Sequence, residues 1–355
     1  MYTSSARFFF MALVICYWAC SPSTSTDDEQ APDPPSSFAS GIFVVNQGSE
    51  QNSNQTGTIT FYDRTDDQAT QNVFRSINSG LDLGNKVHSM TVFNELAYIV
   101  VSNERKVEVV NLNTFERLGS ISTDIQVPKY FLPVGNDKAY ISKWSMDSSE
   151  GWIQVVDLTT NTTIRNILTR PGPEKMLRHG DFLYVCNSGG FLLDSVVTKI
   201  NILTDEVVNT IEVGLSPHRL ELDRNDHLWV ISRGFKSGNL EREGQLSRIE
   251  NDAVVFSLAV PAGSGNLVIN AARNRLYYTR PDGIYQHELN QSTLSLAPFV
   301  NFPYVALGFD PQSNTLLASD AINFASNGSV SRYDANAQLL GSFGAGVIPL
   351  EFWFE

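Results

Sequence analysis

The sequence predicts an all-β fold, a seven-bladed β-propeller, because one strand-rich unit recurs along the chain. The clearest copy runs from Phe182 to Gly214 and contains three short strands, over 182–186, 196–201 and 207–213. Each strand is rich in β-branched or aromatic residues and is bounded by Gly, Asn or Asp. We count seven copies, and the others begin at Leu96, Lys138, His227 and Arg275, with weaker ones at Gly41 and Thr315.

A fourth strand is expected before most copies, and it often begins with proline. It is predicted at 87–93, 128–134, 173–179, 217–223, 265–271 and 303–309. The copy at Gly41 has no such strand before it, whereas 346–355 is an alternating apolar run with nothing after it. Four-stranded units that repeat every 40 to 50 residues or so are typical of a β-propeller. We therefore expect the C-terminal strand to join the blade that Gly41 begins and to close the ring.

The N-terminus resembles an export and anchoring signal ahead of a propeller domain over 41–355. Residues 1–19 form a lipoprotein signal peptide, with Arg7 before an apolar run shorter than the roughly 20 residues that span a bilayer. The run ends in Ala19-Cys20, which resembles a lipobox, so Cys20 is the expected lipidation site and a lipid anchor the expected membrane attachment. Residues 20–40, rich in Ser, Pro and acid, are expected to form a flexible tether.

Composition argues against nucleic-acid binding. The formal net charge is −13, and no basic stripe with interleaved aromatics occurs. Cys16 leaves with the signal and Cys20 is acylated, so Cys186 remains alone in a predicted strand, where a buried, inert thiol is expected. We expect a monomer.

The strand order sorts the connections onto two faces. Loops between second and third strands share a face with the crossovers between blades, and the remaining turns lie on the opposite face. Those turns are short and polar, whereas the first face carries long loops at 47–56, 143–151, 187–195, 233–244 and 321–328, joined by crossovers at 76–86 and 169–172. Because function concentrates on loops held by a rigid scaffold, this long-loop face is the expected functional face.

A ligand site is predicted on the long-loop face from bulky side chains and from the starts of the innermost strands. The loop residues concerned are Trp144, Trp152, Asn187, Phe191, Arg233, Phe235 and Phe324. A ring at the channel mouth comprises His88, Lys129, Glu174, His218, Asn266, Tyr304 and Leu350, with Tyr130, Lys175 and Arg219 beside it. This mixture suits a large, partly apolar ligand with polar edges. The alternative is that the aromatics pack between blades and the charges are solvated.

Recognisable catalytic motifs are missing from the sequence. No histidine is spaced from another His, Asp or Glu as in a metal site, and residues 223–226 lack the glycine and terminal glutamate of a calcium loop. There is no Gly-x-Ser-x-Gly elbow. We therefore expect no metal, no cofactor and no enzymatic activity.

The opening Gly41-Ile42-Phe43-Val44-Val45-Asn46-Gln47-Gly48 and the repeated strand motifs resemble the YncE-like seven-bladed β-propeller surface lipoproteins of Bacteroidetes, over about 41–355. Some members of that group capture vitamin B12 on the loop face and pass it to a TonB-dependent transporter. The resemblance thus implies a cobalamin-like molecule as ligand rather than as cofactor. Acids at 27–29 resemble the group's surface-export signal, which implies an outer-membrane anchor with the protein exposed at the cell surface; a periplasmic-facing anchor is the alternative.

Three functions remain open. The first is a non-enzymatic cell-surface lipoprotein that binds a small molecule on the long-loop face and hands it to a TonB-dependent transporter. The second is a propeller enzyme of lyase, lactonase or quinoprotein type, with His88 or His218 as general base. The third is a protein-interaction scaffold or adhesin. The irregular sixth copy, 275–299, has a short connection at 278–284 that leaves one side of the mouth open, as a ligand slot or as a degenerate repeat.

Overall fold

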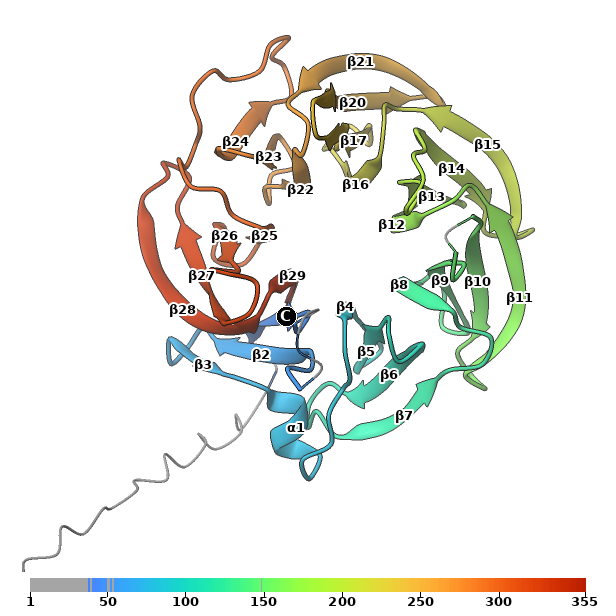
Figure 1. The fold of residues 1–355 in the computed structure, drawn as a ribbon. Helices are drawn as coiled ribbons and strands as arrows, with labels where there is room; N and C mark the ends of the chain where they lie inside the picture. Colours follow the sequence, from blue (N-terminus) through green and yellow to red (C-terminus); the bar gives the residue numbers. More distant parts are fainter. Residues whose placement is uncertain (1–37, 39, 50–51, 53, 148) are drawn as a thin grey trace, which may run out of the picture. The chain divides into compact units, whose positions relative to one another are not determined.

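The chain forms a seven-bladed β-propeller, as predicted. The computed structural model describes residues 38, 40–49, 52, 54–147 and 149–355. Seven small antiparallel sheets stand around a central channel, each with one strand beside the channel and the others stacked outward (Figure 1).

Within the described residues, six blades have four strands each, and their order runs from the channel outward. Blade 1 is β29 (Pro349–Phe354), β1 (Gly41–Asn46), β2 (Thr58–Asp63) and β3 (Gln68–Thr70). Blade 2 is β4 (Val87–Phe93), β5 (Leu96–Val101), β6 (Lys106–Asn111) and β7 (Arg117–Ile121). Blade 3 is β8 (Val127–Pro133), β9 (Lys138–Trp144), β10 (Gly151–Asp157) and β11 (Thr162–Thr169). Blade 4 is β12 (Pro173–His179), β13 (Phe182–Asn187), β14 (Val196–Asn201) and β15 (Glu206–Glu212).

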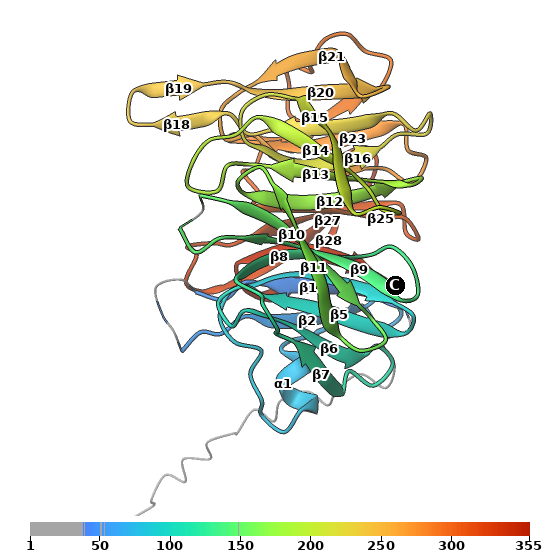
Figure 2. The ribbon, with the colours of Figure 1, turned by 90° about the vertical axis from the view of Figure 1, so that its right-hand side faces the viewer.

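The remaining blades include two departures from the repeat. Blade 5 is β16 (Pro217–Leu222), β17 (Leu228–Ser232), β20 (Gly244–Glu250) and β21 (Ala253–Val260), and a separate hairpin, β18 (Phe235–Ser237) with β19 (Leu240–Arg242), projects from it (Figure 2). Blade 6 has three strands, β22 (Gly265–Ile269), β23 (Arg275–Arg280) and β24 (Gly283–Glu288). Blade 7 is β25 (Ala306–Asp310), β26 (Thr315–Asp320), β27 (Asn327–Tyr333) and β28 (Leu339–Val347).

The C-terminal strand closes the ring, as the sequence predicts. Strand β29 pairs with β1 from Ile42↔Phe354 to Asn46↔Pro349. Arg64, beside blade 1, donates from Nε to Asp310 of blade 7 at 2.8 Å and from Nη1 to the Glu355 carbonyl at 2.7 Å. These contacts join the two ends of the repeat array, which would otherwise leave β1 as an open edge.

Several predicted boundaries shift by one to three residues, and two of the differences concern the crossovers between blades. The strand expected at 303–309 begins only at Ala306, because Pro303 has no N–H to donate and 301–305 still crosses between blades. The crossover expected at 76–86 begins inside a short helix, α1 (Val73–Ile77).

The hydrophobic core lies between neighbouring blades. Tyr98 of blade 2 stacks on Phe131 of blade 3, with ring centroids 4.3 Å apart. Phe38, inside the segment predicted as tether, is 1% exposed and packs against Phe43, Phe61 and Phe115. The propeller core therefore begins before residue 41.

Three further sequence predictions concern the termini and Cys186. The predicted signal peptide, 1–19, and the predicted lipidation site, Cys20, lie outside the described residues. Within the described part of the chain, no helix is long and apolar enough to span a membrane. Cys186 is a buried free thiol, as predicted, and burial raises its pKa well above the usual value, which disfavours the reactive thiolate.

Six of the seven innermost strands carry a β-bulge one residue inside their start. The registers of β4, β8, β12, β16, β22 and β29 all shift there. The extra residues are His88, Lys129, Glu174 with Lys175, His218, Asn266 and Leu350. A bulge bends its strand and re-aims the side chains beside it. Six of the seven positions predicted to ring the channel mouth are thus placed by one repeated backbone irregularity, and Tyr304, which precedes the unbulged β25, is the exception.

Candidate functional site

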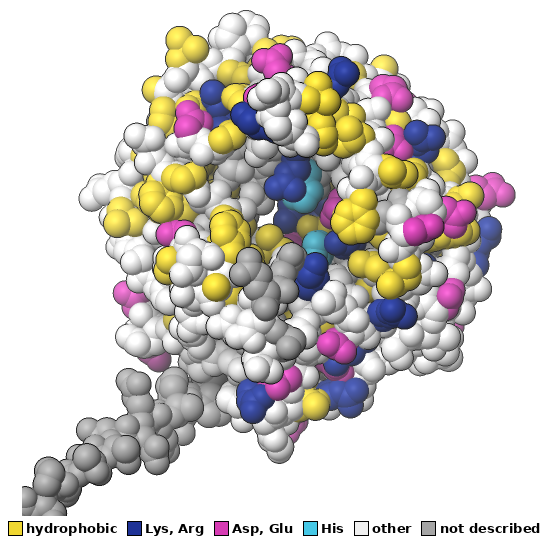
Figure 3. All heavy atoms as spheres, viewed as in Figure 1, with side chains coloured by type: hydrophobic (Ala, Val, Ile, Leu, Met, Phe, Trp, Pro, Cys, Tyr) yellow, Lys and Arg dark blue, Asp and Glu magenta, His cyan; other side chains and the backbone are white. Residues whose placement is uncertain are grey.

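The channel mouth on the long-loop face gathers basic side chains in an acidic protein. Figure 3 shows Lys, Arg and His side chains around the central opening. Lys129, Arg219 and Arg233 act electrostatically on Glu174, and Lys175 pairs with Glu351 at 2.5 Å. In this part of the structure four cations thus lie near three carboxylates, Glu174, Glu351 and Glu221, although the whole chain carries a formal charge of −13.

Tyr130 lies at the centre of this cluster. Its side chain is 4% exposed, and its backbone N–H donates to Ser142 Oγ at 3.1 Å. Lys175 Nζ lies 4.9 Å and Arg219 Cζ 5.3 Å from the ring centroid, within cation–π range. The His88 ring meets the same ring edge-on at 5.1 Å. Tyr130 therefore holds cations from blades 4 and 5 at the mouth.

Both mouth histidines are neutral at pH 7. Burial, with the positive charges of Lys129 and Arg219, holds the pKa of His88 well below its ordinary value. Burial, with Arg233 and Arg219, does the same for the pKa of His218. A neutral imidazole can accept as well as donate a hydrogen bond, so these side chains add polar capacity without further charge.

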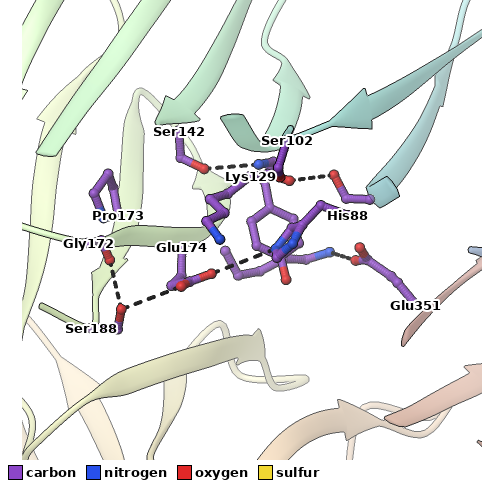
Figure 4. A network of polar contacts seen from close by, with 12 residues as sticks. His88, Ser102, Lys129, Ser142, Gly172, Pro173, Glu174, Ser188 and Glu351 are labelled. Carbon is purple, nitrogen blue, oxygen red and sulfur yellow. Dashed lines mark hydrogen bonds and ion pairs between the residues drawn. The ribbon is translucent and has the colours of Figure 1, made fainter. Parts of the chain in front are cut away.

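Glu174 faces His88 across the mouth. The distance from His88 Nε2 to Glu174 Oε2 is 3.9 Å, and the two side chains point toward one another beside Lys129 (Figure 4). Burial raises the pKa of Glu174, while Lys129 and Arg219 oppose that shift. Ser188 Oγ lies 3.4 Å from Glu174 Oε1 and 3.1 Å from the Gly172 carbonyl oxygen.

A pocket of about 570 Å³ opens on the side of the mouth formed by blades 5, 6, 7 and 1. Its lining includes Arg233, Asn266, Arg280, Tyr304 and Phe324. The opening coincides with the short turn Pro281–Asp282 between β23 and β24, where every other blade except blade 2 carries a loop of at least six residues. The gap predicted at the sixth copy is therefore a real pocket.

Trp144 and Phe191 form an aromatic wall on the blade 3 and blade 4 side. Trp144 Nε1 donates to the Pro173 carbonyl at 3.0 Å, and Lys129 Nζ lies 3.9 Å above its ring. Phe191 meets Trp144 edge-on at 6.0 Å and is 83% exposed. Trp144 is therefore held in place, whereas Phe191 is exposed and can contact a binding partner.

The other predicted site residues are placed less centrally. Asn187 is buried, donates to the Arg170 carbonyl at 2.7 Å and accepts from Thr198, so its polar groups serve the blade. Tyr304 lines the pocket while its hydroxyl bonds to that of Tyr333 at 2.7 Å. Phe235 begins the β18–β19 hairpin, and Trp152 is half-buried in β10. Phe324 is 56% exposed at the pocket rim.

Sequence reasoning missed Glu351 and Arg280. Glu351 follows the bulged Leu350 and bonds to Lys175 across the channel, whereas Arg280 ends β23 at the pocket. The sequence signal that could have indicated Glu351 was its position next to Leu350, a predicted mouth residue. Among the described residues, no group of three His, Cys, Asp or Glu is arranged to hold a metal ion.

The fold and the mouth define a seven-bladed β-propeller whose central opening is lined by cationic and aromatic side chains. The chain belongs to the family described as domain of unknown function DUF5074, which matches residues 40–340. No curated protein matches the chain.

Solved structures similar to this chain are propellers of low sequence identity. A quinoprotein alcohol dehydrogenase-like protein from Bacteroides thetaiotaomicron superposes with a TM-score of 0.66 at 16% identity, covering 90% of this chain and 79% of that one. A putative 6-phosphogluconolactonase from Bacteroides uniformis gives 0.64 at 14%, covering 90% and 100%. Another from Bacteroides fragilis gives 0.65 at 12%, covering 91% and 100%. At these identities the likeness concerns the fold alone.

Proposed function

We propose that the protein is a non-enzymatic, lipid-anchored cell-surface protein that captures an anionic small molecule at the channel mouth. The observation that carries the proposal is the excess of cations there, against the acidic balance of the whole chain; Arg219 is buried, Lys129 and Lys175 are half-buried, and Arg233 is exposed. An anion about 4 Å from one of these cations would gain on the order of 4 kcal/mol at an effective dielectric constant near 20. The acidic remainder of the surface would repel the same anion, so that binding is directed to the mouth.

The pocket beside blade 6 supplies the apolar contact that such a ligand needs. Phe324 and Tyr304 offer aromatic surface, while Arg233 and Arg280 offer charge-assisted hydrogen bonds. A cobalamin-like molecule, which carries a phosphate and amide edges on a large partly apolar body, fits this chemistry. On the resemblance to YncE-like surface lipoproteins, the captured ligand would pass to a TonB-dependent transporter in the outer membrane.

The test is a native mass-spectrometry screen of corrinoids, haem and acidic oligosaccharides, followed by calorimetry on any ligand retained. The double variant Arg233→Gln, Phe324→Ala should weaken binding at least tenfold with an unchanged melting temperature. The matched control is Arg165→Gln, Leu203→Ala, which removes one charge and one exposed apolar side chain away from the mouth. Equal affinity in both double variants would reject the mouth as the site.

A second candidate, a lactone hydrolase, is favoured by one observation. His88 is neutral and lies 3.9 Å from a buried carboxylate inside a cationic basin, so it could serve as general base toward an anionic lactone. Two structural neighbours are named as putative 6-phosphogluconolactonases. Turnover of 6-phosphogluconolactone that is lost in His88→Gln, with a rate that falls toward acid pH as His88 is protonated, would replace the capture proposal; no turnover would leave it standing.

A further inference from the structure

Two buried carboxylates at the mouth each keep one oxygen that has no hydrogen-bond partner among the described residues. The side chains of Glu174 and Glu351 are 7% and 9% exposed, and Oε2 is the oxygen concerned in each. Glu351 Oε1 accepts from Lys175 at 2.5 Å, so only its second oxygen is left over. Ser188 has one hydroxyl proton and its nearer acceptor is the Gly172 carbonyl, so Glu174 is poorly satisfied at both oxygens. Buried carboxylate oxygens without a protein donor are expected to accept a hydrogen bond from a bound molecule.

The free oxygen of Glu174 faces an equally free imidazole nitrogen. His88 Nε2 also has no hydrogen-bond partner in the part of the chain that the structure describes, and the 3.9 Å between the two atoms is too long for a direct hydrogen bond. A ligand hydroxyl at this place would donate to Glu174 and hydrogen-bond to His88 as well. Figure 4 shows both side chains directed into the same space.

The surrounding charges decide which donor fits. An ammonium group bound to Glu174 would also lie close to Lys129 and Arg219, whose positive charges act on both Glu174 and His88. Two repulsions would then oppose one attraction. A neutral O–H or amide N–H donor is not repelled, and the same cations still attract an anionic group elsewhere on the ligand.

We propose that His88 and Glu174 form a subsite that recognises hydrogen-bond donors of the ligand. The captured molecule is then an anion that also presents neutral hydroxyl or amide donors. The inference rests on the proposed function, since the anionic group is bound by the mouth cations. It narrows the ligand class to hydroxylated or amide-bearing anions, such as sugar phosphates, and disfavours fatty anions and zwitterions.

Three six-carbon phosphates test the subsite by competition calorimetry: glucose 6-phosphate with hydroxyls, hexyl phosphate without donors, and 6-aminohexyl phosphate with an ammonium. Wild-type protein should bind glucose 6-phosphate about tenfold more tightly than hexyl phosphate, as two net hydrogen bonds would give. In Glu174→Ala this preference should fall to near unity, while hexyl phosphate binds as well or better because a negative charge is gone. Glu206→Ala, an exposed glutamate outside the mouth, is the control and should keep the preference.

The possible outcomes separate the subsite from anion capture as a whole. Equal binding of glucose 6-phosphate and hexyl phosphate by wild type would overturn the subsite and leave anion capture intact. A preference that survives in folded Glu174→Ala, verified by its melting curve, would also overturn it, as would tightest binding of 6-aminohexyl phosphate. If none of the three phosphates binds, anion capture itself fails together with the subsite.

Discussion

Replacing Glu221 with glutamine should stabilise the protein, and more strongly at alkaline than at acidic pH. Glu221 lies on β16 and lines a channel cavity of about 230 Å³ with Lys175 and Arg219. Burial raises the pKa of its carboxyl from 4.5 to about 7, although Lys175 and Arg219 oppose the shift. Glutamine keeps the shape and removes the ionisation.

The size and sign of this stability change follow from the linkage between proton binding and folding. Because its pKa is raised on folding, the folded state binds the proton more tightly than the unfolded chain, and stability is lost as pH rises from about 4.5 through about 7. At about 1.4 kcal/mol per pH unit, the penalty is roughly 1 kcal/mol at pH 5 and about 3 kcal/mol at pH 8. The pH 8 figure is an upper value, because the side chain keeps some contact with water.

The assay is equilibrium urea unfolding of wild type and Glu221→Gln at pH 5, 6, 7 and 8, followed by tryptophan fluorescence. The variant should gain stability over wild type by an amount that grows across this range and levels off above pH 7. Taking the difference removes other titrating groups, including the mouth histidines, from the comparison. A difference that is constant with pH, or that grows toward acid, would refute the reasoning.

Four further predictions test the fold, the pocket and the anchor. Phe38→Ala should lower the free energy of unfolding by about 3 to 5 kcal/mol, measured by urea titration, because a buried ring packed on three others is lost; a cost below about 1 kcal/mol would place Phe38 outside the core. Deleting 349–355 should abolish the cooperative thermal transition seen by circular dichroism, since β1 loses its partner and the ring opens; a sharp transition would contradict closure by β29. Inserting three residues between Pro281 and Asp282 should fill the pocket and weaken ligand binding at least tenfold in calorimetry, with the melting temperature unchanged; unchanged affinity would show that the ligand does not bind in the pocket. Cys20→Ser should move the protein from the membrane to the soluble fraction and end its labelling by an alkyne fatty acid; persistent labelling would point to another anchor.

The fold was predictable because each blade is encoded locally. The strand at 196–201 was predicted to the residue, since β-branched runs and flanking Asn or Asp turns act over a few positions. The start of blade 7 was misplaced because Pro303 resembles the prolines that open other innermost strands, although it lies in the crossover. Phe38 joins the core through contacts with residues far along the chain, which no local pattern reports.

The residues that surround the channel mouth could be predicted from the sequence, but most of the contacts between them could not. His88, Lys129 and His218 were found because they stand at the starts of their strands, where the repeated bulge turns them to the mouth. The Lys175–Glu351 pair joins residues 176 positions apart, and its geometry depends on how the ring closes. The unpartnered atoms of His88 and Glu174 likewise become visible only once three-dimensional distances are known.

Hydrogen–deuterium exchange with and without a ligand retained in the screen tests capture at the mouth most directly. Binding there should slow exchange at the starts of the innermost strands, around 86–90, 128–131 and 217–220, and at the loops beside the pocket, 279–284 and 321–325. The short turns of the opposite face, such as 202–205, should be unchanged. Protection confined to the opposite face or to the outer strands would contradict capture at the mouth.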